Sequence, residues 1–330
     1  MLRVAVLGAG RIGRIHAANA ALNRDATLIA VADPFGDGAQ NLAADWGCDA
    51  SQDPITTLRR SDIDAVVIGT PTDTHVSLTL EAVRNGKAVL CEKPIDLDIT
   101  KVDEAVAEVE RMNGRVMVAF NRRFDPSAQA MRKSMDAGEI GDLRQVIISS
   151  RDPSPPPRSY LKHSGGIFRD MTIHDFDMAR WLLGEEPVQV TATASRLIDP
   201  SLAEIDDFDT VMVNLRTASG RQCHINCCRA TSYGYDQRME VFGADGMLLN
   251  ENLRASTLRR WSSSYTEARE PLLDFFLERY ADAYRTEFEH FRAAIANNAP
   301  MPVTMRDGRQ ALRLADAALE SALSGRVVAV

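Results

Sequence analysis

Short apolar runs alternate with helical patterns along the first third of the chain. Strands are predicted at residues 2–7, 27–32, 65–69, 87–92 and 116–120, with a weaker strand near 48–51. Between them, periodic stretches end at Gly47, Gly86 and Gly114, where glycine can close a helix in the left-handed conformation. This alternation is typical of a doubly wound α/β fold, in which helices cover both faces of a parallel sheet.

The pattern changes after Phe120 to longer alternating runs with few helices between them. Strands are predicted there at residues 144–151, 188–198, 210–216 and 222–229, and helices at 170–183, 272–297 and 308–323. Such runs predict a second α/β domain with a large, open and mostly antiparallel sheet. Because 330 residues exceed the size at which one core usually stops growing, we divide the chain into domains 1–121 and 122–330.

Net charge, hydropathy and cysteine spacing argue against several classes of binding partner. A formal net charge of -8 gives no basic face for nucleic acid, so no nucleic-acid partner is expected. No apolar run approaches the roughly 18 residues of a membrane span, and no signal-peptide pattern follows Met1, so we expect a cytoplasmic protein with no membrane partner. The five cysteines form no CxxC pair, and neither a disulfide framework nor a metal site is indicated.

A glycine-rich motif follows the first strand directly and precedes a helix. In Gly8-Ala9-Gly10-Arg11-Ile12-Gly13, the first glycine permits a tight turn, the second lets backbone approach a pyrophosphate, and the third allows close helix packing. This context predicts a Rossmann domain, although an ordinary glycine-rich turn is the alternative. Asp33, twenty residues beyond Gly13, is placed to bind the adenosine ribose, and no Arg or Lys follows to receive a 2′-phosphate, which favours NAD over NADP.

Two further segments follow later strands of the predicted parallel sheet. Ligands collect beyond the carboxyl ends of such strands, so both segments are expected to border the cofactor. The candidate cofactor contacts among them are Thr70, Pro71, Thr72, His75, Glu92 and Lys93. Lys93 can alternatively be a surface lysine at a strand end.

A third group of candidates lies in the second domain. On a helix over residues 170–183, Asp170, His174 and Asp177 would share one stripe at spacings of four and three. A polar stripe on an apolar helix suggests a lined cavity, whereas a solvated helix face is the alternative.

Together these motifs resemble the Gfo/Idh/MocA oxidoreductase family over essentially the whole chain. The resemblance is carried by the glycine motif, the Thr70–His75 segment, the Glu92-Lys93-Pro94 triplet and the Gly165–Asp175 stretch. It implies a Rossmann domain followed by an α/β domain with an open antiparallel sheet, and a homo-oligomer, tetramer or dimer, formed through that sheet. Carried over by motif, Lys93, Asp170 and His174 take the catalytic positions.

Within that family, four segments are similar to those of members that oxidise inositol. They are residues 121–126, 151–157, 164–184 and 276–284. The similarity implies NAD-dependent oxidation of myo-inositol to 2-keto-myo-inositol (scyllo-inosose). His174 would serve as the general base, Lys93 would stabilise the developing alkoxide, and Asp170 would orient His174 or the substrate.

The same similarity implies a set of polar residues around the substrate. Besides Lys93, Asp170 and His174, they are Asn121, Arg122, Asp152, Asp177, Tyr235, Tyr280 and Tyr284. For Tyr280 and Tyr284, core packing at helical spacing is the alternative. Two other functions remain open: a family dehydrogenase acting on another polyol or an aldose, and a non-catalytic NAD-binding regulatory protein.

Overall fold

The computed structural model describes all of residues 1–330, which form two compact units. Unit 1 comprises Met1–Phe124 and Ala283–Leu312, and unit 2 comprises Asp125–Asp282 and Arg313–Val330. From the sequence, a single domain boundary after residue 121 is expected. The structure instead divides it after Phe124 and returns a C-terminal stretch to the first unit.

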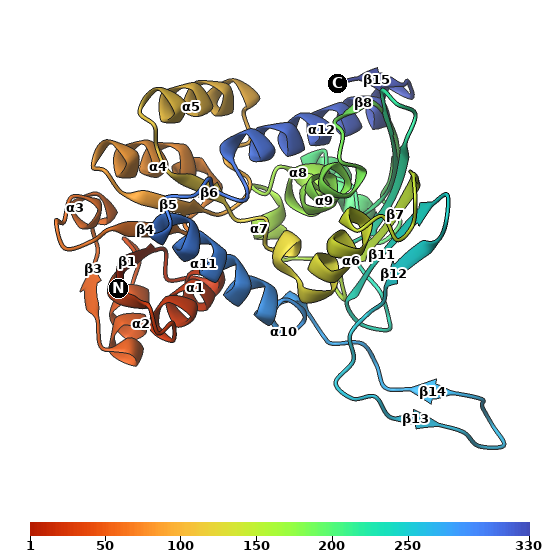
Figure 1. Cartoon of the computed structure of the whole chain (residues 1–330), viewed down its shortest axis with the longest axis horizontal. Coiled ribbons are helices and arrows are strands. Elements are labelled where there is room, and N and C mark those ends of the chain that lie inside the picture. Colours follow the sequence, from red (N-terminus) through yellow and green to blue (C-terminus); the bar gives the residue numbers. More distant parts are fainter. The chain divides into compact units, whose positions relative to one another are not determined.

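Unit 1 contains a six-stranded parallel sheet in the order β3-β2-β1-β4-β5-β6, with helices on both faces (Figure 1). Its elements are β1 (Leu2–Leu7), α1 (Arg11–Ala21), β2 (Ala26–Ala32), α2 (Gly38–Trp46), β3 (Asp49–Ser51), α3 (Pro54–Leu58), β4 (Ala65–Ile68), η1 (Thr72–Thr74), α4 (His75–Arg84), β5 (Ala88–Cys91), α5 (Ile99–Arg111), β6 (Val116–Val118) and η2 (Asn121–Phe124). The strand order reverses between β1 and β4, so ligands are expected beyond the carboxyl ends of these two strands. The predicted parallel sheet, including its weak strand near 48–51, is confirmed.

The returning stretch packs into unit 1 rather than lying on its surface. It contains most of α11 (Ala281–Ala296) and the beginning of α12 (Met305–Ser324). Phe288 and Phe291 of α11 are fully buried, and the Val118 amide donates to the Val303 carbonyl at 3.1 Å. Arg115 extends this contact by donating to the Ala294 carbonyl at 2.6 Å. The core of unit 1 therefore includes residues from both ends of the chain.

Unit 2 is built on a seven-stranded sheet in the order β12-β11-β7-β10-β9-β8-β15. Its elements are α6 (Pro126–Asp136), β7 (Leu143–Arg151), α7 (Arg158–Leu161), α8 (Gly166–Asp170), α9 (Ile173–Leu183), β8 (Pro187–Ser195), η3 (Pro200–Ile205), β9 (Thr210–Thr217), β10 (Gln222–Cys228), β11 (Asp236–Gly243), β12 (Met247–Asn250), β13 (Arg259–Arg260), β14 (Ala268–Arg269), α10 (Phe276–Arg279) and β15 (Val328–Ala329). Strands β7 and β10 pair in parallel, and the other pairs are antiparallel. The expected mostly antiparallel sheet is confirmed, and β11 and β12 add to the predicted strands.

One face of this sheet is covered by helices and the other is open. Along β9, Val211, Val213 and Leu215 are buried, whereas Met212 between them is 54% exposed. The open face carries further large apolar side chains, namely Ile147, Phe242, Met247 and Leu249. Figure 1 shows the β13–β14 hairpin extending away from the sheet as a long arm.

Three local predictions differ from the structure. The helix predicted over residues 170–183 is divided into α8 and α9, and the one over 272–297 into α10 and α11. Gly47 and Gly86 adopt positive φ angles as predicted, but Asn113 rather than Gly114 does so after α5. An asparagine side chain tolerates the left-handed region better than most, so this turn does not need the glycine next to it.

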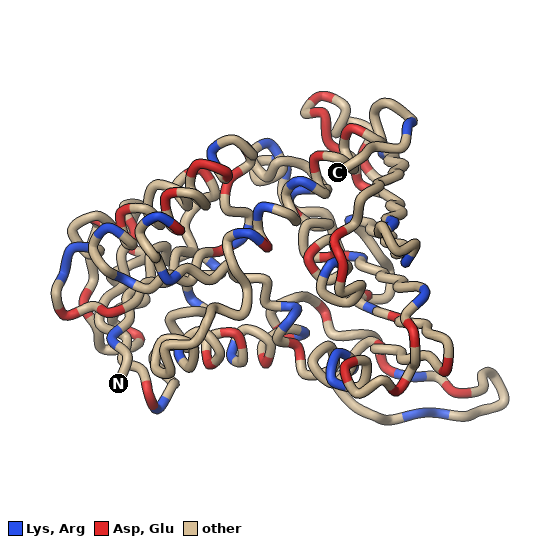
Figure 2. Tube along the Cα trace, turned by 45° about the horizontal axis from the view of Figure 1, so that its top comes forward, with Lys and Arg blue, Asp and Glu red and all other residues tan.

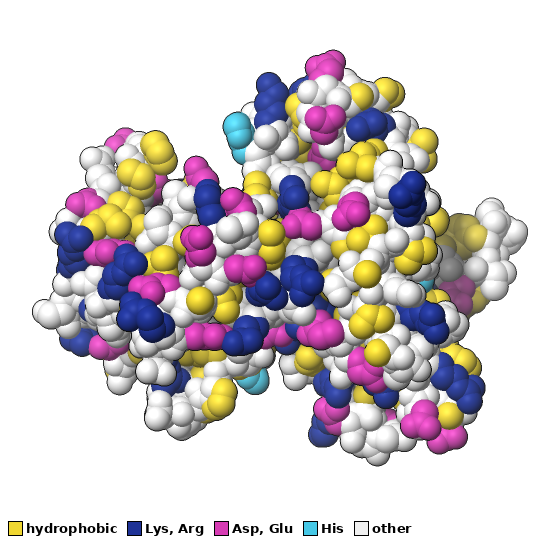
Figure 3. All heavy atoms as spheres, turned by 90° about the horizontal axis from the view of Figure 1, so that it is seen from above, with side chains coloured by type: hydrophobic (Ala, Val, Ile, Leu, Met, Phe, Trp, Pro, Cys, Tyr) yellow, Lys and Arg dark blue, Asp and Glu magenta, His cyan; other side chains and the backbone are white.

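Charged side chains are mixed over the chain rather than segregated by sign. Basic and acidic positions are intermixed along the trace in Figure 2, and they are interspersed on the face seen in Figure 3. None of the helices combines the length and the apolar character that crossing a bilayer requires. None of the five cysteines forms a disulfide.

Candidate active site

The glycine motif of unit 1 forms a tightly packed turn with one open side. A Cβ atom on Gly8, at φ +97°, would lie 2.5 Å from the Gly69 carbonyl oxygen, and one on Gly13 would lie 1.9 Å from the Gly8 carbonyl oxygen. Both positions therefore need glycine for packing. A Cβ on Gly10 would meet no atom within 4 Å, so the space beside this residue, at the N-terminus of α1, is free.

Asp33 lies at the end of β2 beside this turn. Its Oδ2 accepts a hydrogen bond from the Ala9 amide at 2.7 Å, and its Oδ1 accepts one from the Phe35 amide at 2.9 Å. The carboxylate is only half-buried, so it retains lone pairs for a diol. An open backbone beside Gly10, a helix N-terminus and a fixed carboxylate together fit a dinucleotide such as NAD.

His75 lies at the start of α4 and is buried, with both ring nitrogens in hydrogen bonds to backbone. Nδ1 lies 2.7 Å from the Pro94 carbonyl oxygen, and Nε2 lies 2.8 Å from the Thr70 carbonyl oxygen. The ring thereby joins the segments that follow β4 and β5. These two segments hold the candidate cofactor contacts Thr70 to Thr72, Glu92 and Lys93.

Glu92 is buried, and its side chain contacts the backbone amide of Lys93. Its Oε2 accepts a hydrogen bond from the Lys93 amide at 3.3 Å, and its Oε1 lies 2.8 Å from Nε2 of the fully buried His16. Glu287 of α11 is also fully buried, and desolvation together with the Glu92 charge raises its pKa well above the ordinary value. The ring of Tyr284 completes the group, edge to face with His16 at 5.8 Å. The burial of Glu287 could not be predicted from the sequence, because Glu92, its charged neighbour in this group, lies almost two hundred positions away along the chain.

In unit 2, Asp170 is held by a chain of ionic contacts. Its two carboxylate oxygens contact the Tyr160 hydroxyl at 2.7 Å and Nη1 of Arg229 at 3.2 Å. Arg229 is fully buried and its Nη2 lies 3.5 Å from Asp207. Asp207 in turn accepts a hydrogen bond from the Ile167 amide at 2.7 Å.

These contacts hold α8 at both ends, and they also limit the space at the glycine that begins it. Gly165 and Gly166 both adopt positive φ angles, and a Cβ on Gly166 would lie 3.0 Å from Asp207. Asp170 closes α8, and His174 is the second residue of α9, so the two do not share one continuous helix. Sequence reasoning missed Arg229 and Asp207, although an arginine after an apolar strand could have indicated a buried ion pair.

The remaining candidates of unit 2 fall into separate places. Asp177 is buried on α9, 3.7 Å from Arg180, and Asp152 follows β7 directly. Tyr235 and Tyr280 pack edge to face at 6.0 Å, and the Tyr280 hydroxyl lies 3.5 Å from Gln237. Tyr280 precedes α11 instead of lying on the same helix as Tyr284.

The structure thus gathers the candidates into two sets, one in each unit. Unit 1 holds Gly8 to Gly13, Asp33, Thr70 to Thr72, His75, Glu92, Lys93, Asn121, Arg122 and Tyr284, whereas unit 2 holds Asp152, Asp170, His174, Asp177, Tyr235 and Tyr280. Asn121 and Arg122 are buried in η2.

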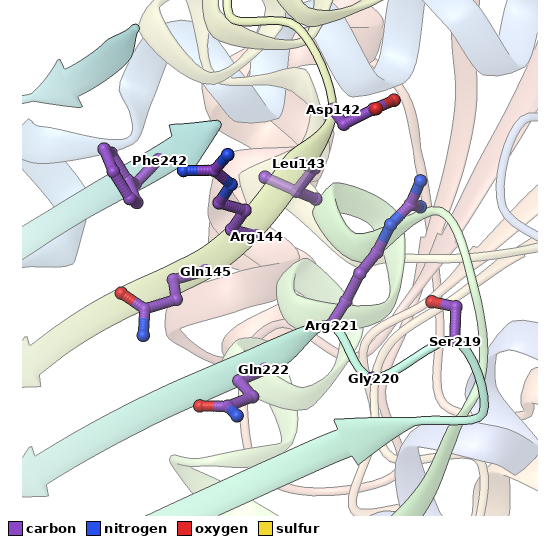
Figure 4. Close-up of a pocket in the computed structure, with 9 residues that line it drawn as sticks. All are labelled: Asp142, Leu143, Arg144, Gln145, Ser219, Gly220, Arg221, Gln222 and Phe242. Atoms are coloured by element: carbon purple, nitrogen blue, oxygen red, sulfur yellow. The ribbon is translucent and has the colours of Figure 1, made fainter. Parts of the chain in front are cut away.

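A hollow of about 480 Å³ elsewhere in unit 2 contains none of these candidates. Its lining comes from the beginning of β7, the turn into β10 and the end of β11, and includes Arg144, Gln145, Arg221, Gln222 and Phe242 (Figure 4). The hollow is open, and neither Asp170 nor His174 lines it. No group of His, Cys, Asp and Glu has the arrangement of a metal site.

Each of the two domains matches a known protein family model. Residues 2–120 match the oxidoreductase family with an NAD-binding Rossmann fold, and residues 128–249 match the GFO/IDH/MocA C-terminal domain. The chain is 50% identical to the inositol 2-dehydrogenase of Rhizobium meliloti (strain 1021) over 331 residues, covering 100% of this chain and 99% of that protein.

Two solved structures show the same fold over the whole chain. A myo-inositol dehydrogenase from Corynebacterium glutamicum ATCC 13032 is 48% identical with a TM-score of 0.97, covering 100% of this chain and 99% of that one. The scyllo-inositol dehydrogenase from Lactobacillus casei, solved with bound NAD(H) and scyllo-inositol, is 28% identical with a TM-score of 0.93 and the same coverage. Because the glycine turn, the topology of each sheet and these full-length similarities agree, the chain belongs to the GFO/IDH/MocA oxidoreductase family.

Proposed function

We propose that this chain is an NAD-dependent dehydrogenase that oxidises one secondary hydroxyl of inositol, converting myo-inositol to 2-keto-myo-inositol. The observation that carries the proposal is the 50% identity to an inositol 2-dehydrogenase along the entire chain. Lys93, Asp170 and His174 are all present, and a protein that only senses NAD would need no complete proton-transfer set.

The chemistry assigns one task to each of these three residues. When bound, NAD would supply the acceptor for the hydride that leaves the carbinol carbon. His174 takes the hydroxyl proton, because imidazole titrates near neutrality and can act as a base there. Lys93 donates a hydrogen bond to the reacting oxygen and stabilises its negative charge. Asp170, fixed by Arg229 and Tyr160, orients His174 or a substrate hydroxyl.

The same proposal assigns residues to the binding of the cofactor and of the polyol. The glycine turn, Asp33 and the segments after β4 and β5 hold the cofactor, and the Asp33 carboxylate disfavours NADP by repelling a 2′-phosphate. Asn121, Arg122, Asp152, Asp177, Tyr235, Tyr280 and Tyr284 remain our proposed contacts for the polyol.

A homo-oligomer is part of the proposal, with the open face of the unit 2 sheet as its interface. Met212, Met247 and Leu249 are each about half exposed on this face, and burying large apolar side chains favours association. Light scattering and sedimentation should therefore give a dimer or tetramer. We place the enzyme in the cytoplasm.

The test is NADH formation, followed by absorbance, with a panel of myo-inositol, scyllo-inositol, other polyols and aldoses. We expect turnover with an inositol, and a loss of at least about a hundredfold in kcat for His174→Ala and for Lys93→Ala. Lys101→Ala and His290→Ala, which remove an exposed lysine and an exposed imidazole, are the matched controls. A higher kcat/KM with an aldose would support the alternative substrate, and no turnover with any compound would support the regulatory alternative.

A further inference from the structure

The imidazole of His75 contacts two hydrogen-bond acceptors that cannot donate. Its Nδ1 lies 2.7 Å from the Pro94 carbonyl oxygen and its Nε2 lies 2.8 Å from the Thr70 carbonyl oxygen. A neutral imidazole carries one N–H and one bare nitrogen, and a bare nitrogen facing a carbonyl oxygen is repelled. Both contacts are satisfied only when both ring nitrogens are protonated.

The surroundings of the ring leave no other way to satisfy these contacts. The side chain is 1% exposed, so water cannot replace either carbonyl. Burial by itself opposes a charge here, but the Cys91 thiol of β5 and the two carbonyls outweigh it and raise the pKa of His75 to about 9. Cys91 is the titratable group that acts on the ring, and the other groups that act on the ring are the Thr70 and Pro94 carbonyls.

The two carbonyls belong to the segments that border the candidate active site. Thr70 follows β4, and Pro94 is the residue directly after Lys93. On its other side, the Lys93 amide donates to Glu92, whose second oxygen contacts His16. The backbone of Lys93 is therefore anchored before and after the residue, and His75 supplies the anchor after it.

We propose that His75 is a positioning residue that remains a buried imidazolium, ties the segment after β4 to the segment after β5, and thereby fixes Lys93. The proposal rests on the proposed function in so far as that function assigns Lys93 to the reacting oxygen. If His75 loses its second proton, one carbonyl loses its donor and the Lys93 backbone is released from one side. A displacement of about 1 Å at a catalytic group can lower turnover on the order of a hundredfold.

The first test observes the ring itself and needs no substrate. The full chain is labelled with ¹⁵N-histidine, and the spectrum of His75→Gln identifies the His75 signals. We expect both ring nitrogens to have the shifts of protonated nitrogen at pH 7 and to change together near pH 9. A neutral tautomer at pH 7 overturns the proposal. Because this measurement does not depend on turnover, it separates a failure here from a failure of the proposed function.

The second test uses a double-mutant cycle with Lys93. Glutamine can donate from only one nitrogen, so His75→Gln should lower kcat by about tenfold to a hundredfold and change the KM for NAD much less. In the Lys93→Ala background the same substitution should add less than about twofold, because no lysine remains to be positioned. An equal loss in both backgrounds, or no loss in the first, contradicts the positioning role.

The pH profile of the unchanged enzyme gives a third readout should His75→Gln fail to fold. We expect kcat to fall on the alkaline side with the same midpoint as the NMR titration of the ring. A kcat that is constant through that midpoint is inconsistent with the proposal.

Discussion

The substitutions Gly10→Ala and Gly13→Ala separate cofactor approach from packing in one turn. Gly10 has φ of -71° and ψ of -168°, which alanine adopts readily, and its added methyl group would meet nothing within 4 Å. The free energy of unfolding should therefore change by no more than about 0.5 kcal/mol. The methyl group would nevertheless occupy the space that a pyrophosphate needs, so we expect the Kd for NAD to rise at least tenfold, which is about 1.4 kcal/mol.

Gly13→Ala should instead lower the free energy of unfolding strongly. Its methyl group would lie 1.9 Å from the Gly8 carbonyl oxygen, and both partners are backbone, so α1 must move by about 1 Å to restore an ordinary contact. Overpacking of this kind costs about 1–3 kcal/mol, and this rigid contact belongs at the upper end of that range.

Two measurements compare these variants. Urea unfolding followed by circular dichroism gives the stability, and isothermal titration with NAD gives the affinity. If Gly10→Ala binds NAD as tightly as the unchanged protein, or loses as much stability as Gly13→Ala does, then the two glycines do not have these separate roles.

Three further substitutions test the charged groups. The folded chain keeps Glu287 protonated above the pH near 4.5 at which the unfolded chain releases that proton, so the free energy of unfolding falls as pH rises. Glu287→Gln should remove this pH dependence. If urea unfolding gives the same stability difference between the variant and the unchanged protein at pH 5 and at pH 8, the expectation is wrong. Arg229→Met leaves Asp170 and Asp207 without their cation and should cost about 3–5 kcal/mol in the same assay, whereas a cost below about 1 kcal/mol would contradict the buried ion-pair chain. Asp33→Ser removes the charge that repels a 2′-phosphate, so the ratio of kcat/KM for NAD over NADP should fall at least about tenfold, and an unchanged ratio would argue against this role.

Elements with strong local signals were predictable to within a residue or two. The strand predicted at 2–7 has the bounds of β1, because an apolar run ends there at a glycine turn that cannot continue a strand. The division between α8 and α9 was not predictable. Asp207 and Arg229, which contact α8, lie tens of residues further along the chain and do not affect the local hydrophobic periodicity.

The candidate site shows the same contrast. The motifs around Gly10 and Lys93 are contiguous and could be read from the chain. The contact of His16 with Glu92 and the burial of Glu287 beside them arise only when α1, β5 and α11 come together. The sequence also gave no sign that residues 283–312 belong with the first unit, since an amphipathic helix does not specify which core it covers.

That return of the chain has a consequence for synthesis on the ribosome. The parallel sheet is translated first, yet the aromatic side chains that complete its core, Phe288 and Phe291, arrive more than 160 residues after Val118. Until then the nascent chain exposes the apolar surface that α11 later covers, and exposed apolar surface invites aggregation. A fragment ending near residue 124 should therefore be an insoluble or chaperone-bound product, whereas joining residues 283–312 to it through a short linker should give a soluble nucleotide-binding unit.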